Sequence, residues 1–447
     1  MAGTGGTTGA VGGAAAGGTG AGGQGQGGSG AGGSPRDGSN DVGQDDVPAQ
    51  DHADSAVGGG DSAETDASVA GNWVGTWACG PQLTETANLP PAPGLSGNTL
   101  RQIVYVSIPG TRLRVQLSNA FGDGPVTMNA VHLAVSTGAG AIDTSTDVGL
   151  TFAGSASITI PAGQAVFSDA FDYPLTALAN IAITIAFGAA PAGVTGHPGS
   201  RTTSYLVAGN AVAAQTLTAP ATAEHWYYIT GIDVMADAAT SAIVALGDSL
   251  TDGRGSTTNL NDRWPDDLSR RLRALTPASA VAVLNQGIGG NAVVSGGLGP
   301  TAVARFARDV LNQRGVRYLI VLEGVNDIGT AAAGTGPAVA NNLITAFGSF
   351  IDMAHARNIR AYGIPITPFG GNTGYDTPEH QTARTTVNTW IRTSGRFDGV
   401  IDLDAAVGDP QAPANLLPGY DSGDHLHLNP AGYQKMADSI DLTLFTL

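Results

Sequence analysis

The chain has 447 residues, and its 20 Lys and Arg against 37 Asp and Glu give a formal net charge of −17. We therefore expect neither nucleic acid nor an anionic membrane surface as a partner, because both bind basic patches. The single cysteine, Cys79, excludes an intrachain disulfide and a zinc site built on cysteines, and its role is left open. No run of about 18 apolar residues occurs, so the sequence predicts no transmembrane span.

Residues 1–70 are predicted to be a disordered linker, Gly-rich at first and acidic afterwards. Small and polar residues fill the stretch 1–33, which cannot bury enough apolar surface to offset its ordering entropy. The stretch 36–66 carries nine acidic residues and one arginine, and like charges keep such a segment extended. No signal peptide is visible, but the segment resembles the tether that follows the export signal of bacterial surface lipoproteins. We expect an extracellular or cell-surface protein, with a cytoplasmic one as the alternative.

Residues 71–238 are predicted to form an all-β sandwich or jelly-roll domain. Apolar residues alternate on both sides of the Pro109-Gly110 turn, over 104–108 and again over 113–117, which is typical of a hairpin. Gly, Pro, Asn or Asp separate the further strand candidates at the spacing of a sandwich. These candidates are 131–135, 156–160, 166–171, 181–187, 203–207 and 226–235.

Over residues 239–447 strands and helices are predicted to alternate, which indicates an α/β fold with a doubly wound parallel sheet. The expected strands are 243–246, 281–284, 318–322, 360–366 and one beginning at 400–403. The expected helices are 262–275, 301–313, 337–357, 378–394 and 430–442. Active sites in such folds lie at the carboxyl ends of the strands, so the polar residues that follow each strand are the candidates for chemistry.

Ser249 follows the first of these strands, within Gly247-Asp248-Ser249-Leu250. A serine placed directly after a buried strand can project its hydroxyl at the sheet edge. Thr251 stands where G-x-S-x-G requires its second glycine, so the nucleophile elbow of α/β-hydrolases is not predicted. Taken alone, the motif is also compatible with an ordinary turn.

Glycines 287, 289 and 290 follow the second strand. Their spacing does not match the dinucleotide loop G-x-G-x-x-G, and no suitable acidic residue follows. A glycine here lets a backbone N–H face a ligand, although a tight turn would use the same residues.

The third strand is followed by Asn326, whose side-chain amide could face a developing negative oxygen or cap an Asx turn. Near the last helix, Asp424 and His427 are three residues apart, so one turn can place the carboxylate beside the imidazole. The spacing of His425 and His427 could suggest a metal, but no third ligand is evident, and we expect none.

These segments are informative in combination, because each lies at the end of a different strand or before the last helix. Together they supply the nucleophile, base, orienting carboxylate and oxyanion donors of acyl transfer. The segments resemble the four sequence blocks of the SGNH (GDSL-type) hydrolases, over about residues 241–447. The region 73–235 resembles more loosely, through 72–77 and 100–102, the jelly-roll domain that precedes some secreted bacterial SGNH esterases.

The resemblance implies a flavodoxin-like sheet and a role for each site residue. Ser249 is expected to be the nucleophile, His427 the general base and then acid, and Asp424 the residue that orients the imidazole. The oxyanion is expected to contact the backbone N–H groups of Ser249 and Gly290 and the side-chain amide of Asn326. No metal or organic cofactor is implied, since water attacks the acyl-enzyme.

We thus expect a serine esterase that acts on small-molecule or polysaccharide esters, with O-acetyl groups on carbohydrate favoured. The alternatives are a short-chain lipid or aryl esterase and, in another class, a non-catalytic surface carbohydrate-binding protein. Acyl chain length, the alcohol, the oligomeric state and carbohydrate binding by the β-domain are left open. The segment 195–198 of the β-domain could reach the site, but an ordinary surface turn is expected there.

Overall fold

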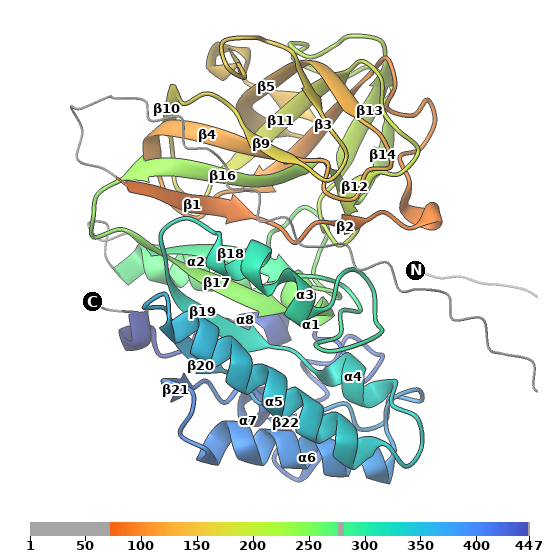
Figure 1. The fold of residues 1–447 in the computed structure, drawn as a ribbon, viewed down its shortest axis with the longest axis vertical. Coiled ribbons are helices and arrows are strands. Elements are labelled where there is room, and N and C mark those ends of the chain that lie inside the picture. The colour runs from red at the N-terminus through yellow and green to blue at the C-terminus, as the bar shows by residue number, and fades with distance from the viewer. Residues whose placement is uncertain (1–71, 276–280, 446–447) are drawn as a thin grey trace, which may run out of the picture. The chain divides into compact units, whose positions relative to one another are not determined.

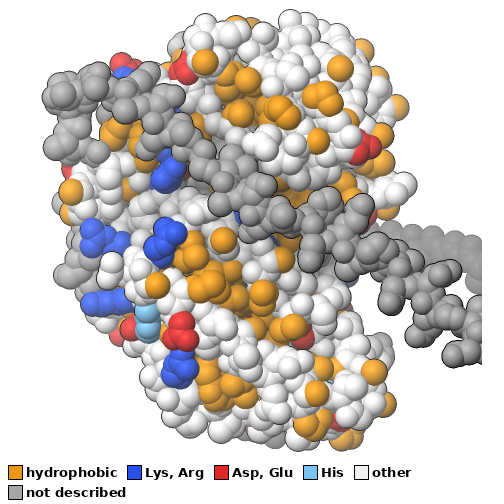
Figure 2. All heavy atoms as spheres, in the orientation of Figure 1, with side chains coloured by type: hydrophobic (Ala, Val, Ile, Leu, Met, Phe, Trp, Pro, Cys, Tyr) orange, Lys and Arg blue, Asp and Glu red, His pale blue; other side chains and the backbone are white. Residues whose placement is uncertain are grey.

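The computed structural model describes residues 72–275 and 281–445, which belong to one compact unit (Figure 1). The predicted linker 1–70 lies outside the described residues. Within the two described ranges, no helix has both the length and the hydropathy needed to cross a membrane. On the face shown in Figure 2 charged side chains are few, as expected for a chain of which 13% is charged.

Residues 72–236 form antiparallel sheets, which confirms the predicted all-β region. One sheet has the order β1-β16-β4-β10, with β9 beside β4. Its strands are β1 (Asn72–Ala78), β4 (Gly110–Ser118), β9 (Ala165–Phe167), β10 (Phe171–Leu175) and β16 (Ile229–Ala236). The larger sheet has the order β14-β13-β3-β11-β5-β6, with β7 and β8 also paired with β5. Its main strands are β3 (Asn98–Tyr105), β5 (Val126–Gly138), β11 (Asn180–Phe187) and β13 (Ser204–Ala208).

Shorter elements complete this β-rich region. The remaining strands of the larger sheet are β6 (Ala141–Ile142), β7 (Val148–Gly149), β8 (Ile158–Ile160) and β14 (Ala221–Ala223). A third sheet joins β2 (Gln82–Leu83), β12 (Thr195–His197) and β15 (Trp226–Tyr227) in the order β15-β12-β2. Two single-turn 3₁₀ helices, η1 (Thr86–Asn88) and η2 (Thr144–Thr146), lie between strands.

Residues 241–445 form the predicted α/β fold around one parallel sheet of order β18-β17-β19-β20-β21. In chain order this is 2-1-3-4-5, the flavodoxin-like arrangement, so the predicted doubly wound sheet is confirmed. The strands are β17 (Ser241–Gly247), β18 (Val281–Gly287), β19 (Val316–Leu322), β20 (Arg360–Gly363) and β21 (Gly399–Val400). A small hairpin, β22 (Gly408–Asp409) and β23 (Ala412–Leu416), lies outside this sheet.

Helices pack around the parallel sheet, with α2 beside α8 and α5 beside α6 (Figure 1). The longer ones are α2 (Trp264–Leu275), α5 (Gly336–His355), α6 (Pro378–Thr393) and α8 (Pro430–Asp438). The short ones are α1 (Ser249–Asp252), α3 (Ala302–Phe306), the π-helical turn η3 (Ala307–Leu311), α4 (Val325–Gly329), α7 (Leu403–Val407) and the 3₁₀ turn η4 (Leu442–Phe445).

Two of the predicted strands end earlier than the sequence suggested. β20 stops at Gly363, and the N–H of Ile366 donates instead to Asn388 Oδ1 at 2.7 Å. β21 stops at Val400, because the Asp402 side chain accepts from the N–H of Ala405 at 3.1 Å and caps helix α7. Local side-chain hydrogen bonds therefore compete with the sheet at both positions.

The β-rich region packs directly on the parallel sheet through β1 and β18 (Figure 1). The N–H of Gly75 donates to Arg314 O at 3.0 Å, and a Cβ at Gly75 would lie 2.9 Å from Leu284 Cδ1. Ser107 Oγ accepts from the N–H of Val283 at 3.2 Å. Buried apolar side chains of both regions accordingly belong to one continuous core. The division into separate domains at residue 238 stays a prediction.

One buried arginine, Arg305 in α3, binds the carboxyl ends of three neighbouring strands, β18, β17 and β19. Each of its five N–H groups has an acceptor, so the guanidinium is saturated. The acceptors are Gly247 O at 2.9 Å, Gln286 O at 2.6 Å, Asn291 Oδ1 at 3.0 Å, Asp309 Oδ2 at 3.2 Å and Glu323 Oε1 at 3.1 Å. The guanidinium thereby links the three loops that follow β17, β18 and β19.

We expect Arg305→Met to lower the free energy of unfolding by about 3–5 kcal/mol, because Asp309 and the strand-end carbonyl groups would lose a buried donor. Urea unfolding followed by tryptophan fluorescence measures the change. Arg396→Met is the matched control, since the ion pair of Arg396 with Asp352 at 2.7 Å is largely exposed, and such pairs contribute little. A loss no larger than in the control would contradict the role given to Arg305.

Candidate active site

Ser249 opens a one-turn helix, α1, directly after the first parallel strand. Asp248 caps this helix, because its Oδ1 accepts from the N–H of Leu250 at 2.9 Å. Gly247 ends the strand where a Cβ would lie 2.0 Å from Thr251 Oγ1, so no larger residue fits this turn. The hydroxyl of Ser249 is therefore presented at the carboxyl edge of the sheet.

Ser249, His427 and Asp424 form one line of short contacts. Ser249 Oγ lies 2.8 Å from His427 Nε2, although the two residues are 178 positions apart in the sequence. His427 Nδ1 lies 2.6 Å from Asp424 Oδ2. An ionised carboxylate only accepts, so Nδ1 carries the proton and Nε2 is left to accept from the serine hydroxyl.

The surroundings set the charge of each member of this line. Burial lowers the pKa of His427; Asp424 opposes this, and the positive charges of Arg254 and Arg201 add to it, so the net direction is downward. Burial alone would raise the pKa of Asp424, but hydrogen bonds from the backbone and ring of His427 outweigh it and hold that pKa at about 2. At neutral pH the imidazole is thus a neutral base beside an ionised carboxylate.

The predicted oxyanion residues lie in the loops that follow β18 and β19. Gly290 has φ +71°, in the left-handed region that favours glycine. Asn326 Nδ2 donates to Asn291 O at 2.7 Å, and Asn326 Oδ1 accepts from the hydroxyl of Tyr375 at 2.7 Å. These two bonds fix the amide plane and leave the second N–H of Nδ2 for another acceptor.

Asp327 joins the same two loops. Its carboxylate accepts from the N–H of Val293 at 2.8 Å and from that of Val294 at 3.1 Å. The segment after Gly290 is therefore tied to the helix that carries Asn326.

His425 does not share a ligand position with His427. Its Nδ1 lies 2.6 Å from Asp421 Oδ2 in the same loop. Among residues 72–275 and 281–445, no group of three or more His, Cys, Asp and Glu side chains is arranged to hold a metal ion.

The sequence interpretation missed three residues around the site. Tyr375 orients Asn326, and Arg305 links the strand ends, but neither belongs to a recognisable motif. The third is His197, and the expectation that 195–198 is an ordinary surface turn was wrong. His197 is buried, and its Nε2 lies 2.9 Å from Asp252 Oδ1 at the end of α1.

Residues 245–435 match the GDSL-like lipase/acylhydrolase family. No curated protein matches this chain. Three solved structures resemble it remotely. A G-D-S-L family protein from Desulfitobacterium hafniense has 18% identity, covers 44% of this chain and 97% of its own, and gives a TM-score of 0.34.

The second is an acetylxylan esterase from Geobacillus stearothermophilus, with 19% identity, 44% and 91% coverage and a TM-score of 0.35. The third is a lipase/acylhydrolase from Enterococcus faecalis, with 19% identity, 44% and 92% coverage and a TM-score of 0.35. These likenesses are too remote to indicate a substrate. The match identifies residues 245–435, which contain four of the five parallel strands in whole or in large part, as a GDSL-like lipase/acylhydrolase domain, and the protein is a carboxylic ester hydrolase.

Proposed function

We propose that the protein is a serine esterase that works through an acyl-enzyme, with Ser249 as the nucleophile. The observation that carries this proposal is the line of contacts from Ser249 Oγ through His427 to Asp424. Such a line removes the hydroxyl proton while the oxygen attacks. The family match and this line argue against the alternative of a non-catalytic binding protein.

In the first half of the reaction, Ser249 Oγ attacks the ester carbonyl carbon while His427 Nε2 takes the hydroxyl proton. The carbonyl electron pair moves onto oxygen, where the N–H groups of Ser249, Gly290 and Asn326 Nδ2 stabilise it. Collapse of this intermediate breaks the bond to the alcohol oxygen, which takes the proton from His427. Asp424 stabilises the imidazolium that exists between the two proton transfers.

In the second half, water attacks the acyl-enzyme while His427 Nε2 takes a proton from it. Collapse of the second intermediate breaks the bond to Ser249 Oγ, which recovers its proton from His427. The products are the alcohol, the carboxylic acid and the free enzyme, and these steps use only side chains, backbone N–H groups and water.

Among carboxylic esters we favour O-acetyl groups on carbohydrate. The predicted linker and the β-rich region support this choice, because they suit an enzyme that acts on extended extracellular material. On the same ground we place the protein outside the cell or at its surface, with the cytoplasm as the alternative. The division into a linker (1–70), a β-domain (71–238) and a catalytic domain (239–447) is part of this proposal.

A short-chain lipid or aryl ester is the second candidate, and one observation favours it. Val294 and Leu298 lie in the segment after Gly290, and both apolar side chains are exposed. Leu298 also lies close to the oxyanion loop, since a Cβ at Gly290 would be 3.0 Å from its Cδ1. An apolar rim at this position suits an apolar acyl chain or aryl group.

We expect Ser249→Ala to lower kcat/KM for 4-nitrophenyl acetate by at least about 10³-fold, because the variant has no nucleophile. Release of 4-nitrophenol measures the rate. Ser241→Ala is the control, since Ser241 lies at the start of the same strand and its hydroxyl is buried without a partner among the described residues. Equal rates for wild type and Ser249→Ala would overturn the proposed function.

The pH dependence of kcat/KM tests the base. The reactive form of His427 is neutral, so kcat/KM rises through its pKa; because that pKa is lowered, the midpoint of the rise lies below about pH 6.5. Asp424→Asn should lower kcat by about 10²–10⁴-fold, because an amide N–H would turn Nδ1 into an acceptor and leave the proton on Nε2. It should also move the acid limb to still lower pH, since Asp424 raises the pKa of His427.

Asp421→Asn is the matched control for this test, because Asp421 binds the neighbouring His425 with the same 2.6 Å contact. The expected result is a rate and a pH profile close to those of wild type. A midpoint of the rise well above pH 6.5 in the wild type, or an Asp424→Asn variant as active as Asp421→Asn, would contradict the assignment.

The substrate is tested by release of acetate from acetylated xylan, pectin and chitooligosaccharides, compared with 4-nitrophenyl acetate, butyrate and octanoate. We expect the highest kcat/KM on acetylated carbohydrate. For these substrates Leu298→Ser should change kcat/KM by less than about threefold, because a polar side chain at the rim of the site is compatible with a bound sugar. Leu83→Ser, an exposed leucine on β2, is the control. A preference for butyrate or longer chains that Leu298→Ser reduces by about tenfold or more would favour the second candidate.

A further inference from the structure

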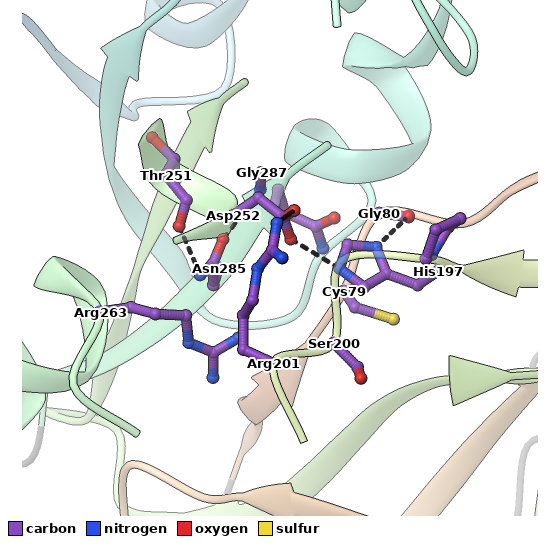
Figure 3. Close-up of polar contacts among 12 residues, drawn as sticks. Cys79, Gly80, His197, Ser200, Arg201, Thr251, Asp252, Arg263, Asn285 and Gly287 are labelled. Carbon is purple, nitrogen blue, oxygen red and sulfur yellow. Dashed lines mark hydrogen bonds and ion pairs between the residues drawn. The ribbon is translucent and has the colours of Figure 1, made fainter. Parts of the chain in front are cut away.

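The carboxylate of Asp252 is buried at the end of α1 and is bound by two side chains from the β-rich region (Figure 3). Asp252 Oδ1 lies 2.9 Å from His197 Nε2, and Asp252 Oδ2 lies 3.2 Å from Arg201 Nη2. Only 1% of the Asp252 side chain is exposed. The helix that begins with Ser249 thus ends in an ionic contact with the other region of the protein.

Both ring nitrogens of His197 face hydrogen-bond acceptors. Its Nδ1 lies 2.9 Å from Gly80 O, and its Nε2 faces the carboxylate of Asp252 (Figure 3). The ring also stacks on Trp226, with centroids 5.5 Å apart, which fixes its plane.

The pKa of Asp252 is lowered although its carboxylate is buried. Burial would raise its pKa, but the charges of His197 and Arg201 outweigh burial and lower it. A buried carboxylate between two cationic donors forms charge-assisted hydrogen bonds, which are about twice as strong as neutral ones. The contact is therefore suited to hold a backbone segment in place.

There is little space for Asp252 to move. A Cβ at Gly199 would lie 1.7 Å from Asp252 Oδ2, and a Cβ at Gly287 would lie 2.2 Å from the backbone nitrogen of Asp252. Backbone of the β-rich region therefore packs on one side of this residue and the end of β18 on the other. A displacement of His197 or Arg201 would be transmitted to α1.

Helix α1 has four residues and cannot hold its own orientation, because isolated helices of this length are unstable. Within the turn, the N–H of Asp252 donates to Asp248 O at 2.9 Å, and the N–H of Gly253 donates to Ser249 O at 2.9 Å. These bonds shape the turn without fastening it to the protein. Asn285 Nδ2, which donates to Thr251 O at 2.8 Å, and the carboxylate of Asp252 fasten it from outside.

We propose that His197 and Arg201 are positioning residues of the esterase: through Asp252 they fix the turn that presents Ser249 to His427. The β-rich region then contributes to the geometry of the active site. This inference rests on the proposed role of Ser249 as the nucleophile. It assigns no contact with the substrate to either residue.

The first test compares His197→Leu, which cannot bind Asp252, with His197→Gln, whose side-chain amide can still donate to it. We expect kcat for 4-nitrophenyl acetate to fall by about 10–100-fold in His197→Leu with KM changed by less than about threefold, and to recover most of its value in His197→Gln. The rate of inactivation by diethyl 4-nitrophenyl phosphate, which reacts with the nucleophile, should fall in parallel with kcat.

His132→Leu is the matched control for the first test. His132 also lies in the β-rich region, and its Nδ1 also lies 2.9 Å from an aspartate oxygen, that of Asp147. His132 lies in β5, and Asp147 directly precedes β7, which pairs with β5. We expect kcat and KM of this variant to match those of wild type.

The second test uses Arg201, whose side chain is 28% exposed, so that Arg201→Met is the variant better tolerated by folding. The positive charge of Arg201 lowers the pKa of His427, as do burial and Arg254, whereas Asp424 raises it. Arg201→Met should therefore move the acid limb of kcat/KM to higher pH, and Arg201→Lys should restore it. This shift reports the charge of Arg201 at His427, whereas a fall in kcat with KM nearly unchanged reports the displacement of the turn that carries Ser249.

The outcomes separate this inference from the proposed function. If wild type is active and Ser249→Ala is not, but His197→Leu keeps the wild-type kcat, the positioning role is overturned and the esterase assignment stands. If His197→Leu does not fold, Arg201→Met decides: a kcat equal to that of wild type at the pH plateau overturns the role, wherever the acid limb lies. Equal activity of wild type and Ser249→Ala overturns both.

Discussion

The active site depends on one buried cation that binds three strand ends at once. Arg305 donates to Gly247 O, which precedes the nucleophile turn, to Gln286 O in β18 and to Glu323 after β19. Carbonyl groups at the carboxyl end of a parallel sheet need donors, and burial of an arginine requires acceptors for every N–H. The hydrogen bonds of Arg305 to these strand ends meet both requirements. Burial, and then the charge of Asp248, raise the pKa of Glu323 well above its ordinary value.

The residues that could be predicted from the sequence are those with a local signal. Ser249 directly follows a buried strand, and Asp424 and His427 are three positions apart, so their neighbourhood is fixed by a single strand end or turn. Arg305 and His197 carry no such signal, because their partners are brought together only by the packing of distant segments. The α/β alternation predicted the parallel sheet, but the ends of β20 and β21 were set by side-chain hydrogen bonds that periodicity does not report.

Acidic residues gather around Ser249, the proposed nucleophile, in a protein that is already strongly anionic, yet the pKa of His427, the proposed base, is lowered. The explanation lies in how each acid is compensated. Asp252 is bound by His197 and Arg201, and Asp327 accepts from two backbone N–H groups. Paired in this way, these carboxylates add little negative potential at His427, where burial and nearby arginines prevail.

The site is thus held from two directions, and the two supports differ in kind. Arg305 and the strand ends fix the backbone from within the parallel sheet, whereas Asp252 connects the short helix α1 to a separate sheet system. The exposed side chains of Val294 and Leu298 belong to neither support and lie in a loop beside the oxyanion residues. In the proposed mechanism, changes in that loop would alter which ester fits without moving Ser249. The proposed chemistry and selectivity then depend on different parts of the chain, as expected where rigid elements carry reacting groups and loops carry recognition.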